Sequence, residues 1–422
     1  MDPSKPIARN AGLALGLLLA INLLNYIDRY ILAAVEPLIS GQFFAAADES
    51  AKAKTGSLAT AFLVSYMVLA PLFGAMADRF SRWGIIALGV GVWSLASGWS
   101  GLAQTFSMLL VSRVLVGVGE AAYGPAAPTI IADLYPVERR GMVLSFFYMA
   151  IPVGSALGYA IGGWLGRDHG WRAPFFAVVV PGLILAGLCL LMRDPRKAIT
   201  SAKPKLKIAD ILALFRIRSY VMNTAAMTAM TFAIGGIAFW LPRYLYEERA
   251  ADFGGKPDLA HINLIFGVIT LIAGLSATLL GGWCGDQVRK TRASSYFLVS
   301  GIAMLFAFPV TVTMLKTPFP WAWILVFLAE FFLFFNTGPA NTALANVSPP
   351  AIRASAFALN IFLIHAFGDA ISPPLIGWIA GQTSMNFAFI IVSAMMVVAS
   401  ACWLIGARYL PGDTAAAEKM VA

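Results

Sequence analysis

Apolar residues fill long, nearly uninterrupted runs along the chain, and short polar segments separate these runs. A helix that crosses a membrane needs about 20 consecutive apolar residues. The runs that meet this length lie at 12–38, 55–77, 84–104, 106–134, 138–165, 171–192, 218–246, 262–284, 293–315, 321–347, 352–380 and 385–408. The pattern predicts an all-α integral membrane protein with twelve transmembrane helices.

The composition agrees with this pattern. Hydrophobic residues make up 59% of the 422 residues and charged residues only 12%, whereas a soluble domain carries roughly 25% charged residues. The net charge of +9 comes from basic residues in the loops, so we expect no nucleic-acid partner. Three cysteines lie in separate apolar runs without metal-ligand spacing, which predicts neither a disulfide framework nor a metal site.

The basic residues predict the orientation in the membrane. An even number of helices places both termini on one side, and twenty of the 30 Lys and Arg residues fall on that side. Eight fall on the opposite side, and Arg29 and Arg113 lie inside predicted spans. Because Lys and Arg accumulate in cytoplasmic loops, both ends are predicted to be cytoplasmic. We interpret the first residues, MDPSKPIARN, as a cytoplasmic tail and not as a removable signal peptide.

The two halves of the chain repeat one another. The segment GPAAPTIIADLYPVERRG at 124–141 resembles GPANTALANVSPPAIRAS at 338–355, and Gly163 and Trp164 match Gly377 and Trp378 at the same offset of 214 residues. Such a repeat is typical of transporters built from two parallel-repeat bundles. We therefore predict two pseudo-symmetric six-helix bundles at 1–192 and 218–410, a basic cytoplasmic linker at 193–217 and a cytoplasmic tail at 411–422. The linker is expected to contain a short amphipathic helix around 208–215. We favour the interpretation that the charged linker sets the membrane topology over the interpretation that it is a regulatory or partner site.

The loop GAMADRFSRW at 74–83 and its weaker copy GWCGDQVRK at 282–290 resemble the signature loop of the major facilitator superfamily (MFS). In that family these loops latch the cytoplasmic ends of neighbouring helices. Asp133 and Glu138 are expected to pair with Arg139, Arg140 or Arg79. The predicted latch residues are Gly74, Asp78, Arg79, Arg82, Asp133, Arg139, Asp286 and Arg289.

Four charges lie at unusual depth within the predicted spans. Asp28 and Arg29 are near the middle of the first span, and Arg113 and Glu120 are in the fourth. Arg113, Gly117, Glu120 and Gly124 follow one another at steps of four, three and four residues, so they share one helical face. The four charges occupy overlapping depths if these two helices face each other. Ionisable residues at this depth are rare and usually functional.

The stretches NYIDRYILAAVEP and GEAAYGPAAPTIIADLYPVERRG together resemble the Spinster family of lipid exporters. The resemblance implies transport of sphingosine-1-phosphate or lysophospholipid-like cargo, with Asp28, Arg29, Arg113 and Glu120 as its polar centre. It also implies a bacterial-type homologue in the inner membrane, working as a monomer. The candidate cavity residues are Asn25, Tyr26, Tyr123, Phe232, Trp240, Glu330, Phe334, Asn336, Thr337 and Asn341.

We expect alternating access coupled to protons, because protonation of Asp28 or Glu120 would free an arginine to bind a phosphate or carboxylate. An organic-anion/proton symporter and a polyspecific drug exporter remain alternatives. A membrane enzyme is disfavoured, since the three histidines form no metal or nucleophile–base set. We expect no cofactor beyond the coupling proton. His365 and Asp369 are either a titrating pair or a packing pair.

Overall fold

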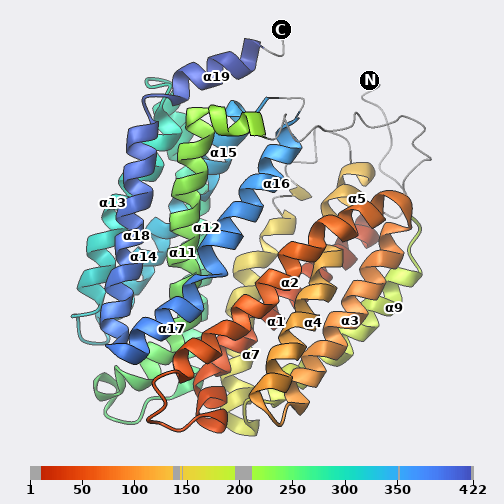
Figure 1. Ribbon diagram of the computed structural model, residues 1–422, viewed down its shortest axis with the longest axis vertical. Coiled ribbons are helices and arrows are strands. Elements are labelled where there is room, and N and C mark those ends of the chain that lie inside the picture. The colour runs from red at the N-terminus through yellow and green to blue at the C-terminus, as the bar shows by residue number, and fades with distance from the viewer. Residues whose placement is uncertain (1–10, 136–142, 145, 195–211, 350–351, 420–422) are drawn as a thin grey trace. The chain divides into compact units, whose positions relative to one another are not determined.

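The structure, a computed structural model, describes residues 11–135, 143–144, 146–194, 212–349 and 352–419. Within these ranges twelve helical stretches are long and apolar enough to cross a membrane, which confirms the predicted number (Figure 1). They cover 11–43, 51–77, 82–102, 106–131, 146–169, 173–190, 218–247, 259–289, 295–314, 322–347, 355–382 and 385–406. The protein is therefore an all-helical membrane protein, as the hydrophobic runs predict.

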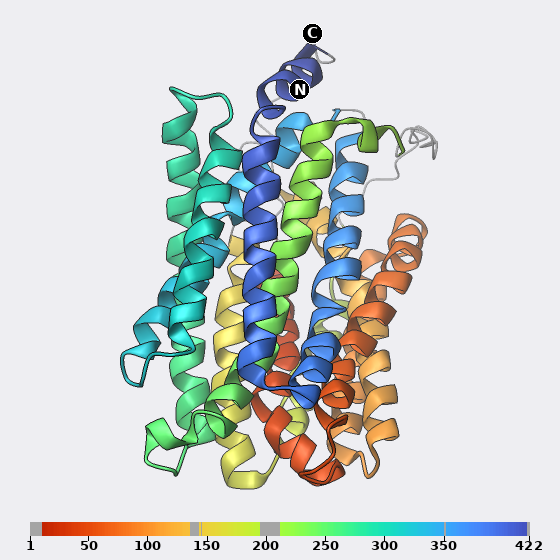
Figure 2. The same cartoon turned by 60° about the vertical axis from the view of Figure 1, so that its left-hand side comes forward.

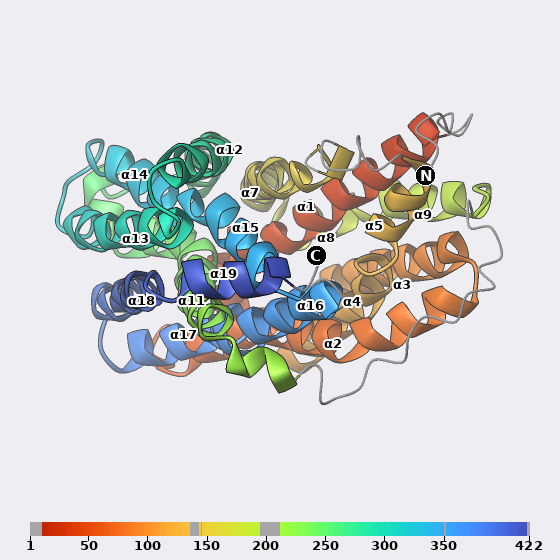
Figure 3. The same ribbon diagram turned by 90° about the horizontal axis from the view of Figure 1, so that it is seen from above.

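The chain divides into two compact units. Unit 1 comprises Met1–Ala202 together with Pro257–Val268. Its described helices are α1 (Ala11–Phe43), α2 (Ala51–Arg79), α3 (Arg82–Leu102), α4 (Phe106–Tyr123), α5 (Ala127–Leu134), α7 (Ala150–His169), α8 (Ala173–Ala177), α9 (Val179–Leu190) and the first turns of α12 (Leu259–Arg289). Helix α1 packs against α7, and α4 packs between α2 and α3 (Figure 3). The predicted division at 193–217 stays a prediction.

Glycines allow close contact between α1 and α7 in unit 1. A Cβ added at Gly154, Gly158 or Gly162 of α7 would overlap Tyr26, Ile27 or Ala34 of α1. Small residues at such crossings let backbones approach, which stabilises helix pairs in lipid through van der Waals contact. The contact with α7 fixes the rotation of α1 about its axis, and with it the direction in which the charged residues of α1 point.

Unit 2 comprises Lys203–Lys256 and Ile269–Ala422. Its described elements are η1 (Leu214–Arg216), α11 (Arg218–Glu247), η2 (Ala250–Phe253), the rest of α12, α13 (Ser295–Met314), α14 (Ala322–Phe335), α15 (Thr337–Val347), α16 (Arg353–Ile364), η4 (His365–Asp369), α17 (Ser372–Gln382), α18 (Met385–Gly406) and α19 (Leu410–Lys419). Helix α18 packs against α11 and α13 (Figure 2). The predicted tail at 411–422 is largely helical, and Asp413 accepts a hydrogen bond from the Ser219 amide at 2.8 Å. Of the predicted amphipathic helix at 208–215, the first half, 208–211, falls outside the described residues, and the second half is helical and runs into η1.

The fourth and tenth spans, which the sequence predicts as continuous, are each interrupted close to a proline that matches in the repeat. The fourth span breaks between α4 and α5 at Gly124–Ala126, and the tenth breaks between α14 and α15 at Asn336. Pro125 follows the first break residue, and Pro339 is its counterpart in the repeat. Proline lacks the amide donor and clashes with the preceding turn, so it interrupts a helix. Interrupted helices are a recurring feature near transporter binding sites.

Candidate functional site

Helices α1 and α4 bring two opposite charges together inside unit 1. The guanidinium of Arg29 binds the carboxylate of Glu120, with Nη2–Oε2 at 2.7 Å and Nε–Oε2 at 2.8 Å. The Glu120 side chain is completely buried. Asn25, one turn before Arg29 on α1, is a further neighbour of Glu120. This contact shows that the charged faces of the first and fourth spans meet.

A second pair lies beside the first and is looser. Arg113 Nη1 is 3.5 Å from Asp28 Oδ2, and each side chain is only 1% exposed. Ser97 of α3 donates a short hydrogen bond to Asp28 Oδ1. Arg113 and Glu120 are seven residues apart on α4, which is about 10 Å along the axis. The two ion pairs therefore form at different depths along α4.

An aromatic ring from α2 lies close to both guanidinium groups. The Phe62 ring centroid is 4.7 Å from Arg29 Cζ and 5.6 Å from Arg113 Cζ. Tyr26 and Tyr66 lie at 5.2 Å and 5.4 Å from Arg29 Cζ. Cations over aromatic faces gain about 0.5–2 kcal/mol, and most when water is excluded. These rings offset part of the desolvation cost of the arginines.

The pair of Asp28 and Arg113 leaves hydrogen-bonding capacity unused. Within the described residues, Asp28 Oδ2 and Arg113 Nε and Nη1 have no hydrogen-bond partner, although all three atoms are buried. A buried polar atom that is left without a hydrogen bond costs about 1–3 kcal/mol, and more when its group is charged. Such an arrangement is suited to accept a proton on the carboxylate or an anionic group on the guanidinium. The four charges form two neighbouring ion pairs between α1 and α4.

The predicted cavity residues lie in both units. In unit 1, Tyr123 is 3% exposed and its hydroxyl donates to the Leu18 carbonyl at 2.7 Å. In unit 2, Trp240 is fully buried, and its indole nitrogen donates to the Pro373 carbonyl at 2.8 Å. Glu330 of α14 is 5% exposed, and its Oε2 lacks a hydrogen-bond partner among the described residues.

Of the remaining unit 2 candidates, one lies on α11 and four lie along α14 and α15. Phe232 is buried. The Asn336 and Asn341 amides donate to the carbonyls of Leu333 and Thr337, at 2.9 Å and 2.8 Å. Phe334, Thr337 and Asn341 are half-buried. Their part in binding cargo stays a prediction.

The predicted latch contains a buried arginine with two acidic partners. Arg82 is 4% exposed; its Nη2 lies 2.7 Å from Asp133 Oδ2 and 2.6 Å from Asp194 Oδ1. The sequence predicts Arg79, Arg139 or Arg140 as the partner of Asp133, whereas its partner among the described residues is Arg82. Arg139, Arg140 and Glu138 lie outside the described residues, as does the side chain of Asp78.

The second copy of the loop, at 282–290, contacts a single tyrosine through its acidic and basic residues. Asp286 accepts a hydrogen bond from the Tyr296 hydroxyl at 2.9 Å, and Arg289 Cζ lies 5.3 Å from the same ring. A Cβ at Gly74 would lie 3.6 Å from Pro125, an ordinary contact distance. The latch role of these residues stays a prediction.

Sequence reasoning missed several residues of the site. Ser97, Phe62 and Tyr66 are single polar or aromatic residues in otherwise apolar spans, and no spacing signals them. Asp194 had a visible signal. It is the one acidic residue in the basic segment RDPRK after the sixth span, and an acidic residue there indicates a partner for a cytoplasmic arginine.

His365 and Asp369 do contact each other. Their pair lies in η4, a single wide turn of π-type helix, with Nδ1 of His365 2.9 Å from Oδ1 of Asp369. Such turns occur often at functional sites. The geometry suits both the titrating and the packing interpretation.

Comparison with known proteins places the chain in a class. Residues 18–373 match the family model described as Major Facilitator Superfamily, so the chain belongs to this superfamily. Its members are transporters and not enzymes. The protein is therefore a multi-pass membrane transporter of a small-molecule substrate.

Within this class the chain belongs to the Spinster family. It is 33% identical to Protein spinster homolog 1 of Xenopus laevis, over 95% of this chain and 81% of that protein. It is 35% identical to the sphingosine-1-phosphate transporter SPNS2 of Mus musculus, over 95% and 78%. A solved bacterial homologue of the human lysosomal transporter Spinster, inward-facing and unoccupied, superposes with a TM-score of 0.82 at 20% identity, covering 96% of this chain and 98% of that one.

Proposed function

We propose that this transporter moves an amphipathic lipid, of the sphingosine-1-phosphate or lysophospholipid type, by alternating access coupled to protons. The mouse relative is named for sphingosine-1-phosphate. The buried Arg113 and the partly buried Arg29 offer charge-assisted hydrogen bonds to a phosphate head group. Phe62, Tyr26 and Tyr66 around Arg29 provide apolar surface beside it.

The single observation that carries this proposal is the incomplete pairing of Asp28 with Arg113. At 3.5 Å the pair is longer than a charge-assisted hydrogen bond of about 2.7–2.9 Å. Both side chains are buried, so neither obtains compensation from bulk water. A proton on Asp28 would remove the attraction and leave Arg113 free for an anionic head group. Departure of the proton would restore the pair and favour release of the cargo.

The pair of Arg29 and Glu120 is a candidate for a second step of the same kind. Arg29 and Glu120 are in full contact, and removing Arg29 would leave the fully buried Glu120 carboxylate without its ion-pair partner, which is costly. A proton on Glu120 together with a phosphate on Arg29 would replace the pair with two neutralised groups. Proton and anion binding would then favour each other, which is the requirement for coupled transport.

We further propose that residues 1–192 and 218–410 form two six-helix bundles and that transport proceeds by alternating access. The basic linker at 193–217 and both termini would then be cytoplasmic, and the protein would act as a monomer in a bacterial inner membrane. The excess of Lys and Arg on the side of the termini supports this orientation.

The test is uptake by proteoliposomes under an imposed pH gradient, with sphingosine-1-phosphate, lysophosphatidylcholine and a sugar acid as separate cargoes. We expect gradient-driven lipid uptake by the wild type and its loss in Asp28→Asn and Glu120→Gln. Glu247→Gln is the matched control, since Glu247 pairs with Arg243 near the end of α11 and is 36% exposed. Unchanged gradient-driven uptake in both test variants would contradict proton coupling. Uptake of the sugar acid without the lipids would contradict the lipid assignment.

A further inference from the structure

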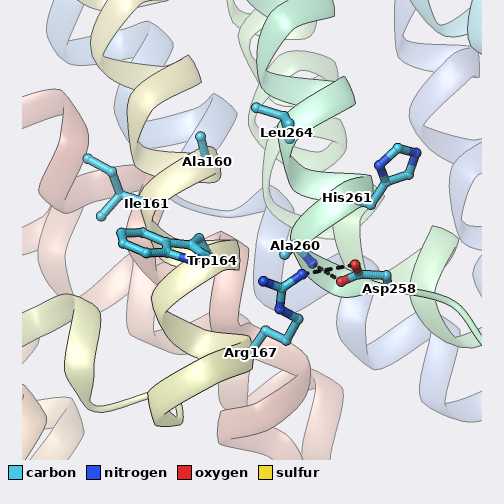
Figure 4. Close-up of a pocket in the computed structure, with 8 residues that line it drawn as sticks. All are labelled: Ala160, Ile161, Trp164, Arg167, Asp258, Ala260, His261 and Leu264. Carbon is cyan, nitrogen blue, oxygen red and sulfur yellow. Dashed lines mark hydrogen bonds and ion pairs between the residues drawn. The ribbon is translucent and has the colours of Figure 1, made fainter.

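A second polar cluster lies in unit 1, far along α7 from the charged centre. Here the end of α7 meets the first turns of α12 around a pocket of about 420 Å³ (Figure 4). This volume is within the range of small-ligand pockets, roughly 300–1,000 Å³. The pocket is lined by Ala160, Ile161, Trp164, Arg167, Asp258, Ala260, His261 and Leu264.

Close packing above the pocket fixes the two helices. A Cβ at Gly163 would overlap the side chain of Asn263, and one at Gly267 would overlap the Ala156 carbonyl. The Asn263 amide donates to the Ala34 carbonyl at 3.1 Å, so α1 holds α12 as well. The walls of the pocket are therefore built by helix contacts and not by mobile loops.

The rim of the pocket carries both signs of charge. Arg167 Nη1 donates to Asp258 Oδ2 at 3.1 Å, and its Nε donates to Asp168 Oδ1 at 2.7 Å. Asp258 Oδ1 also accepts the Ala260 amide at 2.9 Å. Arg167 and Asp258 remain 47% and 44% exposed, so both can contact a ligand. Figure 4 shows the ion pair below Trp164, with His261 on the α12 side.

The walls of the same pocket are apolar and open. Trp164 is 55% exposed and Leu264 is 50% exposed. Trp164 lies three residues before Arg167, about 4.5 Å along the helix axis, and the spanning segment of α7 ends at His169. This depth corresponds to the interfacial layer, where tryptophan is enriched in membrane proteins. A ligand here meets charge at the rim and hydrocarbon along the wall.

We propose that this pocket binds a zwitterionic phospholipid, a phosphate ester of an amino alcohol that carries acyl chains. Its ammonium would lie on the face of Trp164 next to Asp258, since aromatic rings and carboxylates recognise such cations. Its phosphate would accept hydrogen bonds from Arg167 and His261. Its acyl chains would run along Ile161 and Leu264. The site is separate from the cargo site, and a bound lipid would brace the contact between α7 and α12.

The charge balance favours this occupant over an anionic lipid. One guanidinium faces two carboxylates at the rim, so a head group with only negative charge meets net repulsion. A head group with both charges satisfies the guanidinium and a carboxylate together. The exposed Leu264 and Trp164 favour a lipid over the free head group, because only the lipid covers them.

The test is native mass spectrometry of the full chain in detergent, titrated with dioleoylphosphatidylcholine, dioleoylphosphatidylglycerol and glycerophosphocholine. We expect dioleoylphosphatidylcholine to bind the wild type. We expect it to bind Trp164→Leu and Asp258→Asn at least about tenfold more weakly. Trp164→Phe, which keeps an aromatic face, should retain most of the binding. Trp378→Leu is the matched control, because Trp378 is the repeat counterpart of Trp164 and is also 55% exposed.

Three results would overturn the proposal. The first is an equal loss of phosphatidylcholine in Trp164→Leu and Trp378→Leu, which would indicate non-specific annular lipid. The second is equal binding of phosphatidylglycerol by the wild type. The third is equal binding of glycerophosphocholine, which would make the pocket a site for soluble head groups. Uptake of cargo is measured separately, so its failure does not affect this outcome.

Discussion

Replacing Gly117 with alanine should disturb the charged centre more than its size suggests. Gly117 lies on α4 between Arg113 and Glu120. An alanine Cβ at this position would overlap Ser65 Oγ and the Phe62 carbonyl oxygen of α2, and would stand 3.1 Å from the Phe62 carbonyl carbon. Two of these atoms are backbone, so no rotamer change relieves the overlap. Helices α2 and α4 must move apart locally.

The expected magnitude follows from two opposing effects. Alanine in a helix interior is about 0.8–1 kcal/mol more favourable than glycine. Overpacking a well-packed contact costs about 1–3 kcal/mol, and backbone overlap places this site near the upper end. The net expectation is a loss of about 1–2 kcal/mol in the free energy of unfolding. Transport should fall further, because Phe62 contacts both guanidinium groups through its ring.

The assay is unfolding in mixed detergent micelles, together with lipid uptake. Gly91→Ala is the control, since a Cβ at Gly91 of α3 has no neighbour within 4 Å. That substitution should leave stability unchanged or raise it slightly, and leave uptake intact. If Gly117→Ala matches Gly91→Ala in both measurements, the close approach of α2 and α4 does not position the charged centre, and our reasoning is refuted.

Two further substitutions test the packing of each unit by thermal unfolding. Arg82→Ala should cost about 1–3 kcal/mol by leaving two carboxylates without their buried partner, whereas the exposed Arg79→Ala should stay within about 0.5 kcal/mol; equal effects would contradict the structural role of Arg82. Asn223→Leu should cost about 2–4 kcal/mol, because Asn223 accepts from the Trp403 indole at 2.8 Å and donates to the Ala340 carbonyl at 3.0 Å. Trp403→Phe removes only the first bond, and an equally small loss in both variants would show that these hydrogen bonds contribute little.

Hydrophobicity predicts most of this fold, because lipid imposes a simple rule. Each span must satisfy its own backbone hydrogen bonds, so span length and apolar composition nearly determine the element. The breaks at Gly124–Ala126 and at Asn336 do not change hydropathy. Proline and glycine signal them locally, but prolines such as Pro37 and Pro71 lie inside unbroken helices. Neighbouring helices decide which proline ends a helix.

The charged centre could be predicted in part for a similar reason. Ionised groups in a span are so costly that their presence predicts a partner at the same depth, and four such charges leave few pairings. The particular pairing depends on the rotation of α1 about its axis. Asp28 and Arg29 point about 100° apart around α1, and the glycine contacts of α7 with Tyr26 and Ile27 set that rotation.

The position of Phe62 beside both arginines could not be predicted from the sequence. It is one of 29 phenylalanines, and hydropathy does not distinguish it from those that face lipid. Its role arises because Gly117 admits α2 so close that the ring reaches both Arg29 and Arg113. A ring shared by two cations links their positions, so movement of one arginine toward an anion alters the environment of the other. The glycine, rather than any charged residue, makes the two ion pairs parts of one site.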